Sequence, residues 1–152
     1  MYRQAAVIPY RVHEEGVEIA LVTSKGGKRW VVPKGSLDDG EDAMDAASRE
    51  TEEEAGLLGE LVERPIGSYR YTKQNAWHHV DVYVMRVTVV LDSWVEAESR
   101  RRRFMSVEDA LARLHPALHE FVRKAAHLVR AQGGRSRDGS GRSRSRGTAY
   151  AP

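Results

Sequence analysis

The sequence contains no cysteine among its 152 residues. Disulfide bridges, thiol nucleophiles and cysteine-ligated zinc sites are therefore all excluded. The chain also lacks an apolar run long enough to span a bilayer, and its first residues, MYRQAAVIPY, do not have the layout of a signal peptide. The missing signal makes a cytoplasmic location the default expectation, and no membrane partner is expected.

The formal net charge is only +2, but the charge is unevenly distributed. From Gly133 onward the chain has five Arg and one Asp, a net of +4, which leaves −2 for the rest. This Gly/Ser/Arg-rich segment has too little apolar content to build a core. We therefore expect one domain over residues 1–132 and a disordered basic tail over 133–152, either merely solvated or in weak, salt-sensitive contact with nucleic acid or another polyanion.

One acidic stretch stands out, the run Arg49-Glu50-Thr51-Glu52-Glu53-Glu54. In a helix, residues three and four apart share a face, so Glu50, Glu53 and Glu54 point the same way. Three like charges this close repel one another, and a divalent cation with a preference for oxygen ligands, such as Mg²⁺, would relieve the repulsion. The alternative is that the acidic face is simply solvated.

The spacing around this run favours the metal site. Gly35, Glu41, Arg49 and Gly56 complete the pattern G-x5-E-x7-R-E-U-x-E-E-x-G-U together with the glutamates. This pattern resembles the Nudix box of the Nudix hydrolases. The mildest departure is Thr51, at a position that usually holds a larger aliphatic residue. The resemblance implies an α/β fold, an α/β/α sandwich with a central mixed β-sheet and a catalytic loop–helix–loop.

The box can also be interpreted from its residues. We expect Gly35 and Gly40 to supply loop angles closed to other residues, and Gly56 to end the helix in a left-handed cap. Asp38 and Asp39 are turn formers that can cap the helix start. Small apolar side chains would let the helix lie close to a sheet, at Ala43, Ala46 and Ala47. Arg49, four residues before Glu53, can hold a carboxylate in place.

Strand and helix patterns surround the box. We predict strands over residues 4–12, 17–24, 30–32, 57–63, 66–71 and 78–91, and a strand beginning within 100–107. Pro9 suggests that the first strand lies at an edge or a bulge. Residues 69–75 are predicted to form a polar, aromatic loop beside the site. Helices are predicted over 107–114, with Ser106 as N-cap, and over 116–132, ending at Gly133-Gly134.

The resemblance implies a mechanism. Two or three Mg²⁺ ions, with Mn²⁺ as the alternative, would be held by Glu50, Glu53, Glu54 and the backbone carbonyl of Lys34. They would bridge phosphate oxygens and lower the pKa of a bound water. Glu53 or Glu50 would take the proton of that water as general base. Gly35, Glu41, Arg49 and Gly56 would be supporting residues rather than ligands.

The substrate class is suggested by the C-terminal half. Residues 91–94, Glu96, Glu98, the Arg100–Arg103 run and residues 107–110 resemble the diphosphoinositol polyphosphate phosphohydrolases, which also cleave diadenosine polyphosphates. We therefore expect a phosphoanhydride hydrolase acting on a small polyphosphorylated molecule. Arg and Lys suit such ligands because they pair with phosphate oxygens. The candidate substrate contacts are Lys34, Arg100, Arg101, Arg102, Arg103, Arg3, Lys28 and Arg70.

Three alternatives remain open at this level. The substrate could be a nucleoside triphosphate or another nucleoside diphosphate linked to a group X. From a different class, the chain could be a non-catalytic nucleotide- or RNA-binding module that keeps the fold, although the intact acidic run speaks against this. Trp30, Trp94, Tyr69 and Tyr71 could stack on an adenine, but such aromatics more often pack inside the protein.

Overall fold

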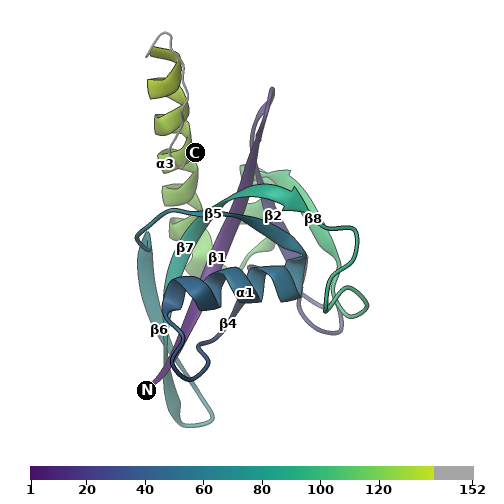
Figure 1. Ribbon diagram of the computed structural model, residues 1–152, viewed down its shortest axis with the longest axis vertical. Helices are drawn as coiled ribbons and strands as arrows, with labels where there is room; N and C mark the ends of the chain where they lie inside the picture. The colour runs from purple at the N-terminus through teal and green to yellow at the C-terminus, as the bar shows by residue number, and fades with distance from the viewer. Residues whose placement is uncertain (139–152) are drawn as a thin grey trace.

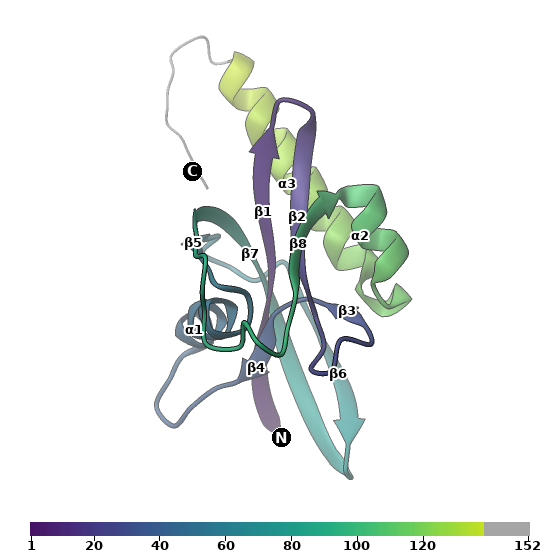
Figure 2. The same cartoon turned by 90° about the vertical axis from the view of Figure 1, so that its right-hand side faces the viewer.

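The computed structural model describes residues 1–138, and it has three layers. A mixed β-sheet lies in the middle, with α1 on one face and α2 and α3 on the other (Figures 1 and 2). This confirms the α/β/α sandwich. The helices are α1 (Ala43–Ala55), α2 (Val107–Arg113), the short 3-10 helix η1 (Pro116–Leu118) and α3 (His119–Asp138). None of the described helices is long and apolar enough to cross a membrane.

The sheet has eight strands in the order β3-β2-β1-β7-β5, with β4 paired to β1, β6 to β7 and β8 to β2. The central pair, β1 with β7, is parallel, and the other pairs are antiparallel. The strands are β1 (Tyr2–His13), β2 (Gly16–Thr23), β3 (Trp30–Val31), β4 (Lys34–Ser36), β5 (Leu57–Leu61), β6 (Gly67–Lys73), β7 (Ala76–Val90) and β8 (Arg102–Ser106).

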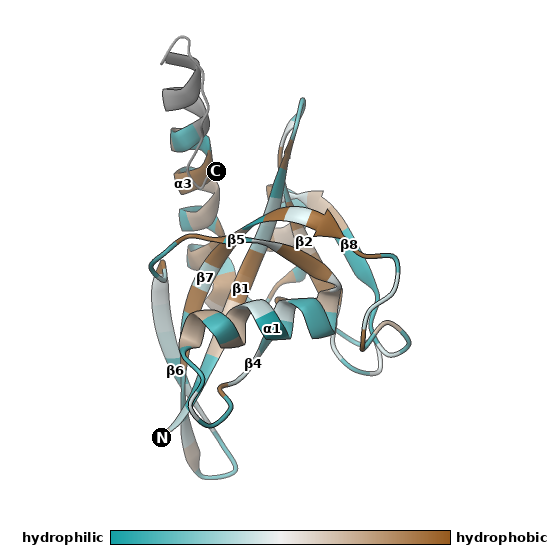
Figure 3. Cartoon of the chain, in the orientation of Figure 1, coloured by the Kyte–Doolittle hydropathy of each residue, from teal (hydrophilic) through white to brown (hydrophobic). Residues whose placement is uncertain are grey.

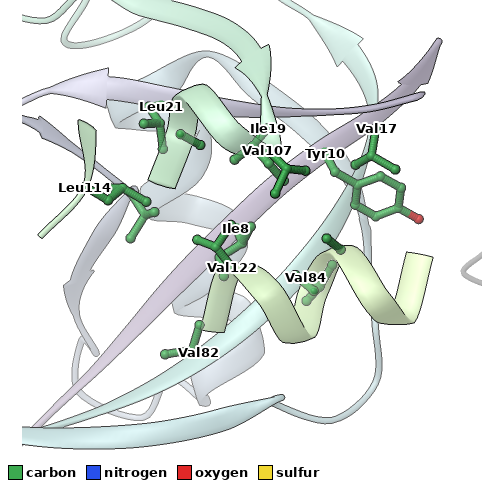
Figure 4. Packing of buried hydrophobic residues seen from close by; sticks show 14 of the residues in the cluster. Ile8, Tyr10, Val17, Ile19, Leu21, Val82, Val84, Val107, Leu114 and Val122 are labelled. Atoms are coloured by element: carbon green, nitrogen blue, oxygen red, sulfur yellow. The ribbon is translucent and has the colours of Figure 1, made fainter. Parts of the chain in front are cut away.

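Of the three hydrophobic clusters in the described residues, the two larger ones contribute most to holding the layers together. The larger one joins the sheet to α2 and α3 through side chains such as Ile8, Leu21, Val82 and Val122 (Figure 4). The smaller one lies under α1, where small side chains meet Val7 of the sheet. Burial of a large aliphatic side chain contributes roughly 1.5–3 kcal/mol, so the first core dominates stability. The hydrophobic colouring accordingly follows the central strands, while the connecting loops are mainly hydrophilic (Figure 3).

Four local predictions are wrong. Residues 69–75 do not form a loop, because β6 continues to Lys73 and turns sharply into β7. Gln74 and Asn75 both have positive φ, of 53° and 64°, as a two-residue hairpin turn requires. Pro9 lies in a central strand, in the interval between the β1 residues paired with β4 and those paired with β2. A residue without an N–H is tolerated there because the pairing partner changes.

The other two errors concern helix ends. The start of α1 is capped by Asp42, whose side chain accepts a hydrogen bond from the backbone of Asp45, and not by Asp38 or Asp39. At the other end of the domain, α3 runs through Gly133-Gly134 to Asp138. Most of the predicted tail, residues 139–152, lies outside the described residues, so its disorder stays a prediction. The cap at Ser106 is confirmed.

Candidate active site

Helix α1 is fixed at both ends and along one side. Gly56 adopts φ 65° and ψ 36°, the left-handed cap expected from the sequence, and its N–H donates to the carbonyl of Glu52. Ala43, Ala46 and Ala47 are buried against the sheet. Because a helix with alanines on its inner face can approach a sheet closely, the acidic residues of α1 are carried on a rigid support.

Arg49 ties the loop before α1 to the acidic run. Its guanidinium donates two hydrogen bonds of 2.9 Å to the carboxylate of Glu41 and one of 3.0 Å to the carbonyl of Ser36. The hydrogen bond from Arg49 is the main reason why the pKa of Glu41 is lowered to about 2. The same guanidinium lies 3.1 Å from Glu50 and 3.6 Å from Glu53. Arg49 therefore joins both of these glutamates to the loop.

Gly35 contributes space and not an unusual backbone angle. Of the two glycines predicted to supply unusual backbone angles, only Gly40 has a positive φ, of 78°. The predicted backbone role of Gly35 is therefore wrong. A Cβ atom added at Gly35 would fall on the carboxylate of Glu50. Only glycine lets the backbone of β4 approach the acidic cluster this closely.

Glu50 and Glu54 are the buried members of the cluster. Their side chains are 14% and 9% exposed, against 37% for Glu53. Burial raises the pKa of Glu54 to about 7, against the opposing effects of Arg100 and the backbone N–H of Lys34. Burial also raises the pKa of Glu50, and the neighbouring charge of Glu53 acts in the same direction. These carboxylates are therefore poorly compensated by the protein itself.

The backbone of Lys34 touches this cluster, but through its amide. The N–H of Lys34 donates a 3.1 Å hydrogen bond to Glu54. The role predicted for its carbonyl, as a metal ligand, stays a prediction. Within residues 1–138, no three acidic or histidine side chains have the convergent geometry of a formed metal site. Arg49 lies between Glu50 and Glu53 instead, and it would have to move for all three predicted ligands to meet one cation.

Comparisons with known proteins agree with this geometry. The family model described as the NUDIX domain matches residues 1–125. The chain belongs to the Nudix family. It is 35% identical over 127 residues to diphosphoinositol polyphosphate phosphohydrolase 3-beta of Bos taurus, covering 80% of this chain and 76% of that protein. It is equally identical, with the same coverage, to the 3-alpha protein of Homo sapiens.

Solved structures show the same fold. A C. elegans Ap4A hydrolase in a binary complex superposes with a TM-score of 0.75 and 24% identity, covering 86% of this chain and 99% of that chain. At this identity the likeness concerns the fold alone. Together with the phosphohydrolase relatives, the family match establishes that the chain is a Nudix hydrolase, and Nudix hydrolases generally use a divalent metal.

The cations predicted to contact substrate are placed very differently. Arg100 is only 11% exposed and is held by Glu96 at 2.6 Å, by the carbonyl of Thr23 at 3.0 Å and by Glu54 at 3.6 Å. Arg102 donates to the carbonyls of Ala55 and Gly56, at the end of α1. Both arginines are therefore bound to other groups of the protein. They support the C-terminal end of α1 and do not form an open, substrate-facing rim of cations. Arg103 is exposed.

The remaining candidates lie on the surface. Arg3 pairs with Asp81 at 3.3 Å, Arg70 lies over the ring of Trp77, and Lys28 is exposed in the loop before β3. Arg101 lies over Trp30, 5.6 Å from the ring centre.

The side chain of Lys34, another predicted substrate cation, contacts Tyr71. Its ammonium donates to the hydroxyl of Tyr71 at 3.2 Å, and that hydroxyl donates to Gln4 at 2.7 Å. Sequence reasoning missed this connection, because Tyr71 fell where a predicted strand (66–71) and a predicted loop (69–75) overlapped. The alternation of residues in β6 was the signal that could have found it.

Two of the aromatic side chains considered for adenine stacking, Tyr71 and Trp94, already have partners on their rings. The ring of Tyr71 stacks with the ring of His78, with 4.8 Å between the two ring centres. The ammonium of Lys34 lies 4.5 Å from the centre of the Tyr71 ring. Trp94 carries the guanidinium of Arg102 at 4.3 Å. These contacts agree with the view that such aromatics usually pack within the protein.

Proposed function

We propose that this Nudix hydrolase is a Mg²⁺-dependent pyrophosphohydrolase that cleaves a phosphoanhydride bond of a small polyphosphorylated molecule, a diphosphoinositol polyphosphate or a diadenosine polyphosphate. One observation carries the proposal. Glu50 and Glu54 are buried on a braced helix, with pKa values raised by that burial. Since burying carboxylates without adequate partners destabilises a protein, a cation-binding role explains why they are there.

The donor set fits Mg²⁺, because Glu50, Glu53 and Glu54 offer only hard oxygen ligands. When bound, the metal would neutralise phosphate charge and activate water. Glu53 is the most exposed of the three, which supports it as the group that accepts the proton of the attacking water, with Glu50 as the other candidate. The ammonium of Lys34, which donates a hydrogen bond to Tyr71, is a candidate to bind a phosphate oxygen.

The ring partners of Tyr71 and Trp94 bear on the choice of substrate. A diadenosine polyphosphate needs a flat surface for at least one base, whereas an inositol phosphate needs only cations. Tyr71 and Trp94 already carry Lys34 and Arg102 on their rings. This supports a diphosphoinositol polyphosphate as the first candidate, as do the names of the relatives. The second candidate is a diadenosine polyphosphate, supported by the Ap4A hydrolase fold.

The test is hydrolysis of a substrate panel with and without Mg²⁺: inositol pyrophosphates, diadenosine polyphosphates, nucleoside triphosphates and sugar nucleotides. The expected result is orthophosphate release from an inositol pyrophosphate, whereas a dinucleotide would give two nucleotides. Glu53→Gln is the control variant. Equal turnover by wild type and Glu53→Gln would discard the catalytic assignment. Tight substrate binding without turnover of any panel member would favour the non-catalytic module instead.

A further inference from the structure

Positive charge is concentrated in the C-terminal part of the chain. The residues from His119 onward carry eight basic and two acidic side chains, a net of +6, so residues 1–118 carry −4 of the total of +2. The basic ones are Arg123, Lys124, Arg130, Arg135, Arg137, Arg142, Arg144 and Arg146. Like charges gathered in this way repel one another and do not help folding. Their concentration would suit a polyanionic ligand.

The described part of α3 presents three of these cations on its surface. Val122, Ala125, Ala126 and Val129 are buried against the rest of the domain. Arg123, Lys124 and Arg130 are exposed, and none of the three forms an ion pair or a hydrogen bond within the described residues. They are therefore free to meet a ligand.

This surface is remote from the carboxylate cluster. Helix α3 lies on the face of the sheet opposite α1, and its C-terminal end passes the tip of the β1–β2 hairpin (Figures 1 and 2). A ligand on α3 therefore need not compete with substrate at the glutamates of α1.

A groove beside the cations gives the surface its shape. It has a volume of about 670 Å³ and lies between α3 and the start of β6. Ile66, Leu128 and Ala131 supply apolar lining, and the polar and charged side chains around it are Glu120, Arg123, Lys124 and His127. The groove is shallow and widely open to solvent, so a flat base can lie against its apolar side chains without being enclosed.

We propose that this face of α3 binds single-stranded nucleic acid. Such ligands present a phosphate at every nucleotide and a flat, largely apolar base beside it, which matches cations placed next to an apolar groove. The sequence that follows α3, GSGRSRSRG at 139–147, adds arginines with Gly/Ser spacing, a composition also found in single-strand-binding segments. A membrane partner would need outward apolar side chains, whereas the exposed positions of α3 within residues 119–132 are mainly charged.

The experiment measures binding of the full chain to a fluorescent single-stranded RNA of about 20 nucleotides, a length chosen to exceed typical site sizes. The RNA has a 5′-hydroxyl and contains no phosphoanhydride, so failure of the proposed hydrolase function cannot affect the result. The test variant is Arg123→Ala/Lys124→Ala/Arg130→Ala. The matched control removes the same charge from exposed positions elsewhere, Lys25→Ala/Arg29→Ala/Lys73→Ala.

Binding is expected to weaken as salt rises from about 50 to 200 mM, as contact with phosphates requires. The helix variant should bind on the order of tenfold more weakly, and its salt slope should be smaller by about 2, since each phosphate contact on a single strand contributes roughly 0.7. The control should bind more like the wild type, and thermal unfolding should be the same for all three.

Several outcomes would overturn the proposal. One is absence of binding at the lower salt concentration. Another is equal loss in the helix and control variants, which would show unspecific attraction. A third is dependence on residues 139–152 alone, with the helix variant unaffected. Tighter, α3-dependent binding to phosphatidylserine vesicles than to RNA would assign the surface to a membrane instead.

Discussion

The close approach of Gly35 to Glu50 makes Gly35→Ala a sharp test of the site. The backbone of Gly35 is not left-handed, so alanine fits the main chain. Its methyl group, however, would occupy the place of the Glu50 carboxylate. Pushing that side chain off its rotamer costs about 0.5–1.5 kcal/mol, and the more restricted unfolded chain returns about 0.4–1 kcal/mol. The thermal midpoint should therefore move by no more than about 4 °C.

Activity should respond far more strongly than stability. Displacing a catalytic group by about 1 Å can cost roughly 100-fold in rate, so we expect a loss of about that size in Mg²⁺-dependent hydrolysis. Both quantities are measured on the same preparation, by circular dichroism and by phosphate release. Near-wild-type turnover of Gly35→Ala would refute the reasoning, since it would mean that the position of Glu50 is unimportant.

The matched control is Gly16→Ala, in the hairpin between β1 and β2. Gly16 has φ 125° and no atom within 4 Å of an added Cβ. Alanine there strains only the backbone, at a cost of roughly 1–2 kcal/mol. Gly16→Ala should therefore lower the thermal midpoint without lowering turnover, the reverse of Gly35→Ala.

Three further predictions concern the helix cap, pH and Lys34. Gly56→Ala should lower the thermal midpoint by roughly 5–10 °C, which is more than Gly16→Ala, because its Cβ would clash with Trp94 at 2.8 Å in addition to straining the left-handed backbone. An equal loss in the two variants would contradict the predicted contribution of the Trp94 contact. Burial raises the pKa of Glu54 to about 7, so the folded protein without metal should lose stability as pH rises from about 4.5 through 7. Glu54→Gln should reduce this dependence of the thermal midpoint on pH, measured in the presence of chelator. An unchanged pH dependence would mean that other groups cause it. Tyr71→Phe should raise KM roughly three- to tenfold with little change in kcat, because it frees the ammonium of Lys34; a loss confined to kcat would speak against binding.

What could be predicted from sequence was local. The shared face of the box glutamates follows from helical spacing, and the caps at Gly56 and Ser106 follow from backbone preferences. Even the departure at Thr51 has a local solution, because its hydroxyl donates to the carbonyl of Ala47 within the same helix, at 2.7 Å. Strand alternation also located most of the sheet.

What could not be predicted depends on contacts between distant segments. Arg100 meets the carbonyl of Thr23, 77 positions earlier, and Arg102 meets that of Ala55, 47 positions earlier. A run of arginines has the same appearance in sequence whether it faces solvent or braces a helix. The hairpin after Tyr71 was missed for another reason, because neither residue of its turn is glycine.

The arginines that support α1 also leave its buried carboxylates only partly compensated. Arg100 opposes the raised pKa of Glu54 without cancelling it, and Arg49 does the same for Glu50. Stronger pairing would stabilise the protein but would leave no unmet charge for a cation to satisfy. At pH 8 without metal, Glu54→Gln should therefore be more stable than wild type while hydrolysing more slowly with Mg²⁺. A variant that lost both stability and turnover would instead make Glu54 a structural residue that the fold needs in its ionised form.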